Sequence, residues 1–346
     1  MKYNPALDGV RALSVIAVVA FHTLYRPVTG AMIGVDVFFV LSGFLITTIL
    51  RGEMQGSGAL DLKRFYVRRA SRLMPPLVLC MAATYVGYVL LVPETRIGLD
   101  VVLSLLYVSD YGISFWGVPE HIRHTWSLSV EEHFYLIWPA FLITTRKLSD
   151  RALLQVLLVM FAVATIWRVA DCLIWDDWVR TYYRFDTRLS GMILGAVLAV
   201  GQWKVSEHAA ARMGGIALYL LALMVVALRW KAMPSLMIGT LAAELAAAAL
   251  VIALTSGHET SVSKMLSRPW LVYLGVLSYS IYLWHYGFAY VLRDAINPVW
   301  AFVISLGASV VISAISHKYV EKPIKAWVNR NHAHAAKRVT EPAYAN

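Results

Sequence analysis

An arginine and a histidine interrupt the first apolar stretch of the chain, and their types and spacing could support catalysis. Arg11 and His22 lie in LDGVRALSVIAVVAFHTLY, residues 7–25, and are eleven positions apart. At about 100° per residue, this spacing is about three helical turns plus 20°, so both side chains project from one helix face. A histidine can act as a general base, and an arginine can stabilise negative charge that develops nearby. The structural alternative is that Arg11 reaches the lipid headgroups and His22 joins two helices.

Two carboxylates on other apolar stretches could act with His22, and Asp36 is the first of them. It lies near the start of GVDVFFVLSGFLIT, residues 34–47, which also contains Ser42. If this second helix returns across the membrane, Asp36 lies at a depth comparable with that of His22. A carboxylate there could hold the imidazole in one tautomer and raise its basicity. The alternative is a buried pair that only holds two helices together.

The second carboxylate belongs to HTWSLSVEEHFYLIWP, residues 124–139, where polar residues recur at helical spacing. Ser127, Glu131 and Tyr135 are four positions apart and therefore form one polar strip. The adjacent Glu132 points about 100° away from Glu131, so the two carboxylates cannot line the same wall equally. We therefore expect Glu131 to face a reaction chamber and Glu132 to be an interfacial or helix-start charge.

Three arginines within one helical turn could bind phosphate. Arg68, Arg69 and Arg72 lie in RFYVRRASRLMPP, residues 64–76. Guanidinium groups bind phosphate through paired hydrogen bonds, so this cluster could clamp a phosphorylated substrate. The alternative is anchoring at the cytoplasmic surface or contact with anionic lipid.

Two further stretches carry polar groups that could line a cavity. YYRFDTRLSG contains Arg184 and Asp186, which suit a hydroxylated ligand such as a sugar, although an ion-pair network is an equal alternative. LSYSIYLWHYG contains Tyr282, His285 and two serines, and this many polar groups in one span favour a lined cavity. No metal site is expected, because the HxxH spacing at 121–124 lacks a third ligand nearby.

Composition indicates which elements position these residues. Of the 346 residues, 59% are hydrophobic and only 15% are charged. So few charges cannot cover the surface of a soluble globule of this size, and we expect an all-α integral membrane protein. The formal net charge of +10 could indicate nucleic-acid binding, but lysines and arginines cluster in short connectors between apolar stretches. This pattern favours orientation in a membrane, with no nucleic-acid partner.

Ten stretches are long enough to cross a bilayer, which takes about 20 apolar residues each. A further stretch, 99–116, is interrupted by Asp100, Asp110 and Gly112. If it does not cross, all the basic connectors lie on the side of the N-terminus. We therefore predict about ten transmembrane helices, both termini in the cytoplasm, and a re-entrant or surface element near 99–116 on the outer side. The ten stretches are 12–25, 31–50, 74–92, 127–145, 152–174, 187–203, 213–230, 236–255, 270–292 and 298–317.

Seven stretches, in one order over residues 7–323, make the chain resemble the acyltransferase 3 family of multispanning membrane acyltransferases. They are LDGVRALSVIAVVAFH, GVDVFFVLSGFLIT, RFYVRRASRLMP, HTWSLSVEEHFYLIWP, RFDTRLSGMILG, LSYSIYLWH and YVEKP. Seven stretches in order are far more specific than any one of them. The resemblance implies a transmembrane acyltransferase domain over residues 1–325. Residues 326–346 are predicted to be a basic cytoplasmic tail without fixed structure.

The resemblance implies an acyl-CoA-dependent O-acyltransferase that spans the bacterial inner membrane several times. It would take an acyl group, by default acetyl, from cytoplasmic acyl-CoA to a hydroxyl of an extracytoplasmic glycan, such as lipopolysaccharide O-antigen or exopolysaccharide. Acyl-CoA would be a donor substrate and not a permanently bound cofactor. Many relatives carry a C-terminal esterase-like domain, and we expect a stand-alone form here. Transfer would then finish in the membrane domain or on a separate periplasmic partner, and a homo-oligomer is a further option.

Carried over residue by residue, the resemblance makes Arg11 and His22 the family's essential pair. Glu131 falls on its Trp-Ser-Leu-x-x-Glu motif and Glu321 on its closing Glu-Lys-Pro. His22, oriented by Asp36 or Glu131, would act as a general base or as a transient acyl carrier. Arg11 would stabilise the thioester oxygen or the leaving thiolate. The acyl-CoA site would consist of Arg68, Arg69 and Arg72, and the acceptor cavity of Ser42, Ser127, Tyr135, Arg184, Asp186, Tyr282 and His285.

Two other functions stay open at this point. One is acyl transfer to a small secreted metabolite, such as a macrolide. The other is a proton-coupled transporter, in which the intramembrane charges would serve coupling. Against a transporter, no inverted repeat is visible and the arginine cluster would have no role.

Overall fold

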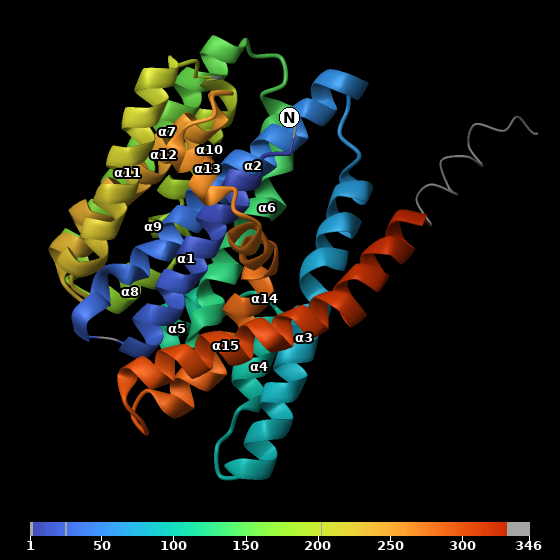
Figure 1. The fold of residues 1–346 in the computed structure, drawn as a ribbon. Coiled ribbons are helices and arrows are strands. Elements are labelled where there is room, and N and C mark those ends of the chain that lie inside the picture. Colours follow the sequence, from blue (N-terminus) through green and yellow to red (C-terminus); the bar gives the residue numbers. More distant parts are fainter. Residues whose placement is uncertain (1–2, 25, 202, 331–346) are drawn as a thin grey trace, which may run out of the picture.

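The computed structural model describes residues 3–24, 26–201 and 203–330, and this part of the chain is helical without any strand. Figure 1 shows the helices in a bundle, with α3 and the end of the described chain extending along one side. After η4 the helix continues to Arg330, so residues 326–330 of the predicted tail are helical, and 331–346 lie outside the described residues. In chain order the elements are α1 (Pro5–Leu24), η1 (Arg26–Ile33), α2 (Gly34–Ser57), α3 (Leu62–Leu91), α4 (Gly98–Leu105), α5 (Ser109–Trp116), η2 (Arg123–Thr125), α6 (Trp126–Thr144), α7 (Asp150–Trp175), α8 (Trp178–Tyr183), α9 (Phe185–Arg188), α10 (Ser190–Gly201), α11 (Glu207–Ala227), η3 (Ser235–Gly239), α12 (Thr240–Thr255), α13 (Ser261–Leu266), α14 (Pro269–Leu292), α15 (Pro298–Ser316) and η4 (His317–Glu321).

Within the described residues, seven helical segments are long and apolar enough to cross a membrane. They are α1, α2 with most of η1, α3, α7, α11, η3 with α12, and α15 with its extension to Arg330. The protein is therefore an all-helical, multi-pass membrane protein. Helices α6, α10 and α14 occupy the three other predicted spans; α10 has only 12 residues, and α6 and α14 are not among the seven segments. The count of ten spans stays a prediction.

The interrupted stretch near 99–116 forms two short helices, α4 and α5, of eight residues each. Eight residues extend for about 12 Å, whereas a bilayer core is about 30 Å thick, so neither helix alone can cross it. The chain turns between them at Tyr107, which has a positive φ of 55°. Asp100 accepts hydrogen bonds from the backbone N–H groups of Glu120 and His121, at 2.9 and 2.8 Å. These contacts hold α4 to the segment that precedes η2 and α6.

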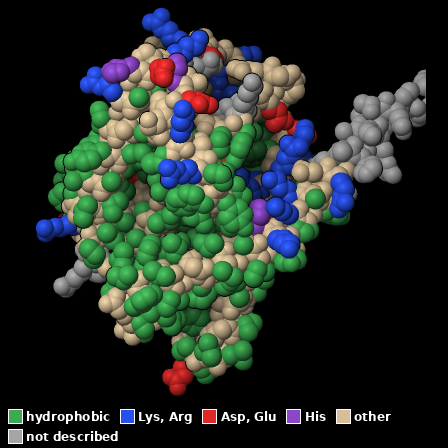
Figure 2. All heavy atoms as spheres, viewed as in Figure 1, with side chains coloured by type: hydrophobic (Ala, Val, Ile, Leu, Met, Phe, Trp, Pro, Cys, Tyr) green, Lys and Arg blue, Asp and Glu red, His purple; other side chains and the backbone are tan. Residues whose placement is uncertain are grey.

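The basic connectors gather at one end of the bundle. Arg51 at the end of α2 pairs with Asp150 at the start of α7, at 2.7 Å. Asn4 donates a hydrogen bond of 2.8 Å to the carbonyl of Leu254, at the end of α12. Figure 1 shows the N-terminus and the turns after α2, α6, α10 and α12 at the same end, and Figure 2 shows lysine and arginine side chains there. That this end faces the cytoplasm stays a prediction.

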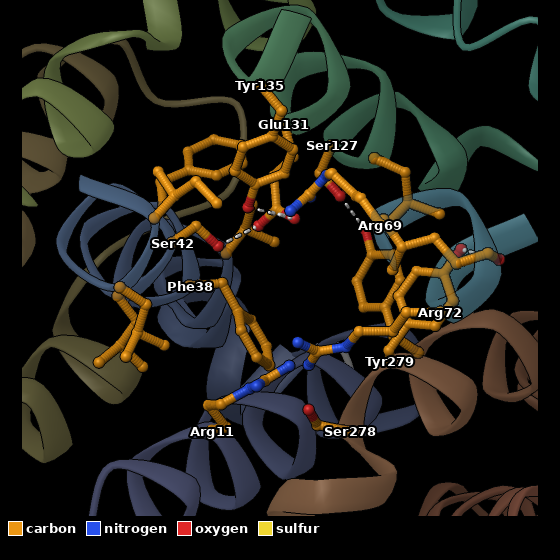
Figure 3. Close-up of a pocket in the computed structure, with 18 of the residues that line it drawn as sticks. Arg11, Phe38, Ser42, Arg69, Arg72, Ser127, Glu131, Tyr135, Ser278 and Tyr279 are labelled. Atoms are coloured by element: carbon orange, nitrogen blue, oxygen red, sulfur yellow. Dashed lines mark hydrogen bonds between the residues drawn. The ribbon is translucent and has the colours of Figure 1, made fainter. Parts of the chain in front are cut away.

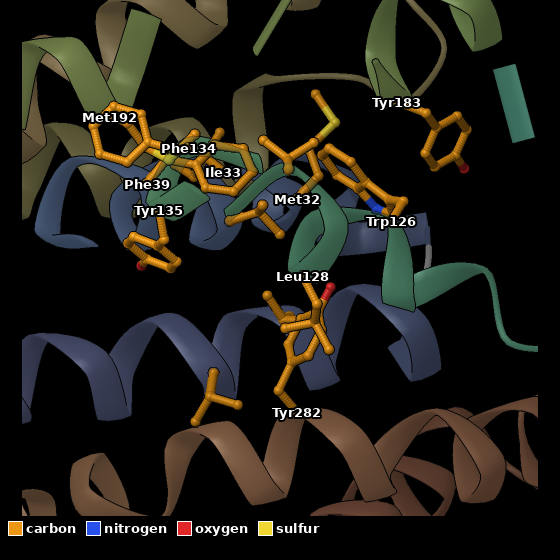
Figure 4. Packing of buried hydrophobic residues seen from close by; sticks show 14 of the residues in the cluster. Met32, Ile33, Phe39, Trp126, Leu128, Phe134, Tyr135, Tyr183, Met192 and Tyr282 are labelled. Carbon is orange, nitrogen blue, oxygen red and sulfur yellow. The ribbon is translucent and has the colours of Figure 1, made fainter. Parts of the chain in front are cut away.

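Aromatic side chains fix α6 against α2 (Figure 4). The ring of Phe134 stacks on Trp138, with centroids 4.4 Å apart. Trp138 also donates a hydrogen bond of 2.8 Å from Nε1 to the hydroxyl of Thr47 on α2. Nearer the other end, the rings of Phe39 and Trp126 meet edge to face. Contacts at both ends of the α2–α6 interface fix the polar residues between them.

Close backbone contact joins α2 to α10. A Cβ atom on Gly43 would overlap the carbonyl of Met192, and one on Gly195 would overlap the carbonyl of Val40. Glycine at both positions therefore lets the two helices approach more closely than larger residues would. This contact sets the position of α2, which carries Asp36 and Ser42.

Replacement of Gly43 tests this packing. We expect Gly43→Leu to lower the thermal unfolding temperature of the detergent-purified protein, because overpacking costs about 1–3 kcal/mol. Gly52→Ala in the same helix is the control, since nothing lies within 4 Å of a Cβ there. The control should change stability by no more than about 1 kcal/mol, in the stabilising direction. Equal unfolding temperatures for the two variants would contradict the close α2–α10 contact.

Candidate active site

A pocket of about 120 Å³, which we call the inner pocket, lies between α1, α2, α3, α6 and α14 (Figure 3). Its walls combine apolar side chains such as Phe38 and Leu45 with a group of charged and hydroxyl-bearing residues. The polar lining residues are Arg11, Ser42, Arg69, Arg72, Ser127, Glu131, Tyr135, Ser278, Tyr279 and Tyr282.

Glu131 is the carboxylate in the lining of the inner pocket. The hydroxyl of Ser42 donates to its Oε1 at 2.8 Å, and the hydroxyl of Tyr135 donates to its Oε2 at 3.3 Å. The neighbouring Glu132 instead pairs with Nε of Arg69 at 3.0 Å. The predicted strip of Ser127, Glu131 and Tyr135 therefore faces one cavity, and the two glutamates point in different directions.

Two of the three arginines that line the inner pocket, Arg11 and Arg72, lack a close carboxylate partner among the described residues. Figure 3 shows the guanidinium groups of Arg11 and Arg72 pointing toward each other at one edge of the pocket. The carboxylate of Asp8 lies 4.0 Å from Arg11, and no acidic side chain in the described residues forms an ion pair with Arg72. Arg69 lies over the ring of Tyr135. Arg68, the third predicted phosphate ligand, is exposed on α3 and does not line the pocket.

A second and larger cavity of about 970 Å³, the outer cavity, lies toward the opposite end of the bundle. It is bordered by the connectors that precede α2, η2, η3 and α15, and charged groups such as Glu120, Arg123 and Asp294 line it. His22 contributes to its wall. The wall is also rich in aromatic side chains, which are Phe21, Trp126, Trp178, Tyr182, Tyr183, Trp230, Tyr282, Tyr286 and Tyr290.

Among the described residues, the imidazole of His22 contacts another histidine and no carboxylate. Its Nδ1 lies 3.0 Å from the carbonyl of Val18 and 3.1 Å from Nε2 of His285. The expectation that Asp36 or Glu131 orients His22 is therefore wrong in this structure. Both carboxylates have other partners, and His285, expected only as a cavity-lining residue, is the side chain that holds His22.

Asp36 belongs to a buried ion pair with Arg188, at 2.6 Å. Both side chains are almost completely enclosed, and a charge with no water around it is stable only when it is paired. A second fully buried pair joins Arg168 on α7 to Glu244 on α12, at 3.0 Å. The hydroxyl of Ser190 donates to the same Glu244 oxygen. These pairs hold together α2, α7, α9, α10 and α12, which indicates a structural role for Asp36.

Two other predicted site residues form ion pairs away from both cavities. Arg184 pairs with Asp171 at 2.9 Å and with Asp186, and neither Arg184 nor Asp186 lines the outer cavity. The ion-pair alternative describes them correctly. Glu321 in η4 lies 3.2 Å from Nδ1 of His317 and outside both linings.

Tyr282 forms the wall between the two cavities. It lines both of them, as does Val35, whereas the successive residues Trp126 and Ser127 each line only one. The hydroxyl of Tyr282 donates to the carbonyl of His124 at 2.7 Å and accepts a hydrogen bond of 2.6 Å from Ser127. Arg11 and His22, although on one helix, therefore lie in different cavities on either side of this wall.

Sequence reasoning missed several of these residues. Arg168 and Glu244 are charges inside apolar stretches, and such residues usually have a partner or a function. His124 was considered only as a metal ligand, but its Nε2 lies 3.2 Å from the carbonyl of Leu283. The aromatic side chains of the outer cavity come from five separate segments, so no local pattern could predict their assembly.

These features define a multi-pass helical membrane protein in which two polar cavities meet at one wall. The chain belongs to the acyltransferase 3 family, because the acyltransferase domain of that family matches residues 4–318. The peptidoglycan O-acetyltransferase OatA of Listeria monocytogenes is 32% identical over 94% of this chain and 56% of its own length. YrhL of Bacillus subtilis, provisionally named a peptidoglycan O-acetyltransferase, is 31% identical over 94% of this chain and 55% of its own length.

The chain thus spans about half the length of these curated relatives. No solved structure matches it.

The Asp36–Arg188 pair gives a direct test of its structural role. We expect Asp36→Leu and Arg188→Leu each to destabilise the protein by about 3–5 kcal/mol, because each leaves an unpaired buried charge. The double variant should lose much less stability, since both charges are gone. Thermal unfolding of the three detergent-purified variants measures this. A double variant as unstable as the sum of the single ones would contradict the pairing.

Proposed function

We propose that this chain is a membrane O-acyltransferase that moves an acetyl group from acetyl-CoA in the inner pocket to a glycan hydroxyl in the outer cavity. The observation that carries the proposal is the meeting of a cationic pocket and an aromatic cavity at Tyr282, with His22 on the outer side. Membership of an acyltransferase family supports the reaction class. The name of the Listeria relative supports acetyl as the acyl group and a glycan as the acceptor.

The charge of the inner pocket supports a donor that carries phosphate groups. Arg72 and Arg11 lack close carboxylate partners, and guanidinium groups bind phosphate oxygens strongly. The apolar walls, including Phe38, Leu45 and Ile49, suit the uncharged arm that joins the phosphates of coenzyme A to the thioester. We propose that the phosphates bind near Arg69 and Arg72 and that the thioester points toward Tyr282.

The lining of the outer cavity supports a carbohydrate acceptor. Aromatic rings can cover the apolar faces of a sugar, while a few charged groups bind its hydroxyls and fix its orientation. Trp178, Tyr182 and Trp230 pack together in this wall, and Glu120 and Arg123 supply polar groups. A glycan of the cell envelope, with peptidoglycan as the first to test because of the relatives' names, fits these groups.

The reaction that we propose is the transfer of an acyl group from sulfur to oxygen. His22 removes the proton from an acceptor hydroxyl, and the oxygen attacks the thioester carbon. The carbon–sulfur bond then breaks, and the thiolate leaves with the proton that His22 held. The products are an ester of the glycan and free coenzyme A. A transient acyl group on His22 is the alternative route, and retention of labelled acetyl on the protein without acceptor distinguishes the two.

The proposed direction of transfer sets the orientation in the membrane. Acetyl-CoA is a cytoplasmic metabolite, so the inner pocket would open toward the cytoplasm together with the basic connectors. The outer cavity would then open on the far side of the bacterial cytoplasmic membrane.

The donor site is tested by binding of acetyl-CoA to the purified protein. We expect Arg72→Ala to raise the Kd about 10-fold, because a hydrogen bond to a charged group contributes about 1.5–3 kcal/mol. Arg68→Ala is the matched control, since Arg68 is an exposed neighbour outside the pocket. The donor site is wrong if Arg68→Ala weakens binding as much as Arg72→Ala does.

The transfer reaction is tested by mass spectrometry of envelope glycans from cells that express the wild type, His22→Ala or no protein. We expect O-acetyl groups only with the wild type, since His22→Ala lacks the base. Acetyl-CoA binding by His22→Ala should stay within about 2-fold of wild type, because His22 lies in the other cavity. If all three glycans are identical, the acceptor is another molecule, such as a secreted metabolite, or the protein is not a transferase for glycans.

A further inference from the structure

His285 is fully buried in α14 and makes two polar contacts. Its Nδ1 lies 2.6 Å from the carbonyl oxygen of Tyr282 and its Nε2 lies 3.1 Å from Nδ1 of His22. His22 makes one other polar contact, with the carbonyl of Val18. This small network fixes the position of the proton on each ring.

The carbonyl partners assign the tautomer of both histidines. A carbonyl oxygen only accepts, so Nδ1 of His285 carries a proton and donates it to Tyr282. Nε2 of the neutral His285 ring is then an acceptor. By the same rule, Nδ1 of His22 carries a proton. This single N–H is shared between two acceptors, the carbonyl of Val18 and Nε2 of His285. All three contacts agree with one arrangement of protons.

The remaining nitrogen of His22 is then free to act as a base. Nε2 of His22 forms no hydrogen bond within the described residues, and it is not among the buried atoms that lack a partner. The His22 residue is partly exposed, and it lines the outer cavity. An unprotonated, accessible ring nitrogen is what removal of a proton from a hydroxyl requires.

We infer that His285 is a positioning residue, which together with the carbonyl of Val18 holds His22 in the tautomer with Nε2 unprotonated and directed to the outer cavity. When Nε2 takes the acceptor proton, Nδ1–H of His22 becomes a charged donor, and its hydrogen bond to His285 strengthens. His285 thus has the orienting role that a carboxylate has in many hydrolases, without adding a buried negative charge. The catalytic consequence rests on the proposed function, whereas the tautomer does not.

Two variants of His285 separate positioning from packing. Glutamine at this position can place its amide oxygen near the former Nε2, whereas leucine supplies no acceptor. We expect His285→Leu to lower kcat about 100-fold, the smaller end of a general-base contribution, with the KM for the acceptor within about 2-fold. His285→Gln should recover at least about a tenth of the wild-type kcat. Equal loss in His285→Gln and His285→Leu would contradict a positioning role.

His124 provides the matched control. It is a buried neighbour of His285, with ring centroids 5.6 Å apart, but it makes no hydrogen bond to His22. His124→Leu should therefore keep a higher kcat than His285→Leu. A larger loss in the His124 variant would overturn the assignment to His285.

Nitrogen-15 NMR of the histidine-labelled protein in lipid bilayers measures the tautomer without any assay of activity. The signal that disappears in His22→Ala belongs to His22, and we expect it to show the Nδ1–H form in the wild type. The Nε2–H form would overturn the inference even if the protein transfers acetyl groups. The Nδ1–H form together with unmodified glycans would reject the proposed function alone, so the two failures can be distinguished.

Discussion

The hydrogen bonds of Tyr282 with Ser127 and with the backbone of His124 connect α14 to α6 at the boundary between the two cavities. The arrangement of the whole site depends on this contact. On one side lie Arg11, Arg72 and Glu131, and on the other lies His22 among aromatic side chains. For an acyl group to pass from donor to acceptor, its carbonyl carbon has to reach past the Tyr282 wall. In the proposed reaction, a charged donor and a polar acceptor would occupy separate cavities, and the reacting atoms would meet at Tyr282.

In the low polarity of the membrane interior, charged groups that stabilise the fold can be told apart from those that could act on a substrate. Asp36 with Arg188, and Arg168 with Glu244, are enclosed and paired, so their charges stabilise helix contacts and are not available to a substrate. Two polar groups that lack such partners face a cavity. Arg72 forms no ion pair in the described part of the chain, and Nε2 of His22 has no hydrogen bond there. Polar groups that the fold leaves free are the ones that a substrate can use.

Local patterns predicted a large part of this architecture. The apolar stretches marked the helices, and the 100° rotation per residue separated Glu131 from Glu132 before any contact was known. Partners distant in sequence could not be predicted in this way. Asp36 pairs with Arg188, which is 152 positions away, and His22 contacts His285, which is 263 positions away. The helical spacing also could not predict that Arg11 and His22 line different cavities. They share a helix face, but eleven residues extend for about 16 Å along the helix, enough to place them in different cavities.

The most direct test of the account is the side of the membrane from which each cavity can be reached. Ser42→Cys reports on the inner pocket and Glu120→Cys on the outer cavity, in a background where the buried Cys80 and Cys172 are replaced by alanine. Labelling with a membrane-impermeant maleimide in oriented vesicles is the measurement. The account predicts that Ser42→Cys reacts only from the cytoplasmic side and Glu120→Cys only from the opposite side. Reaction of both cysteines from the same side would contradict it.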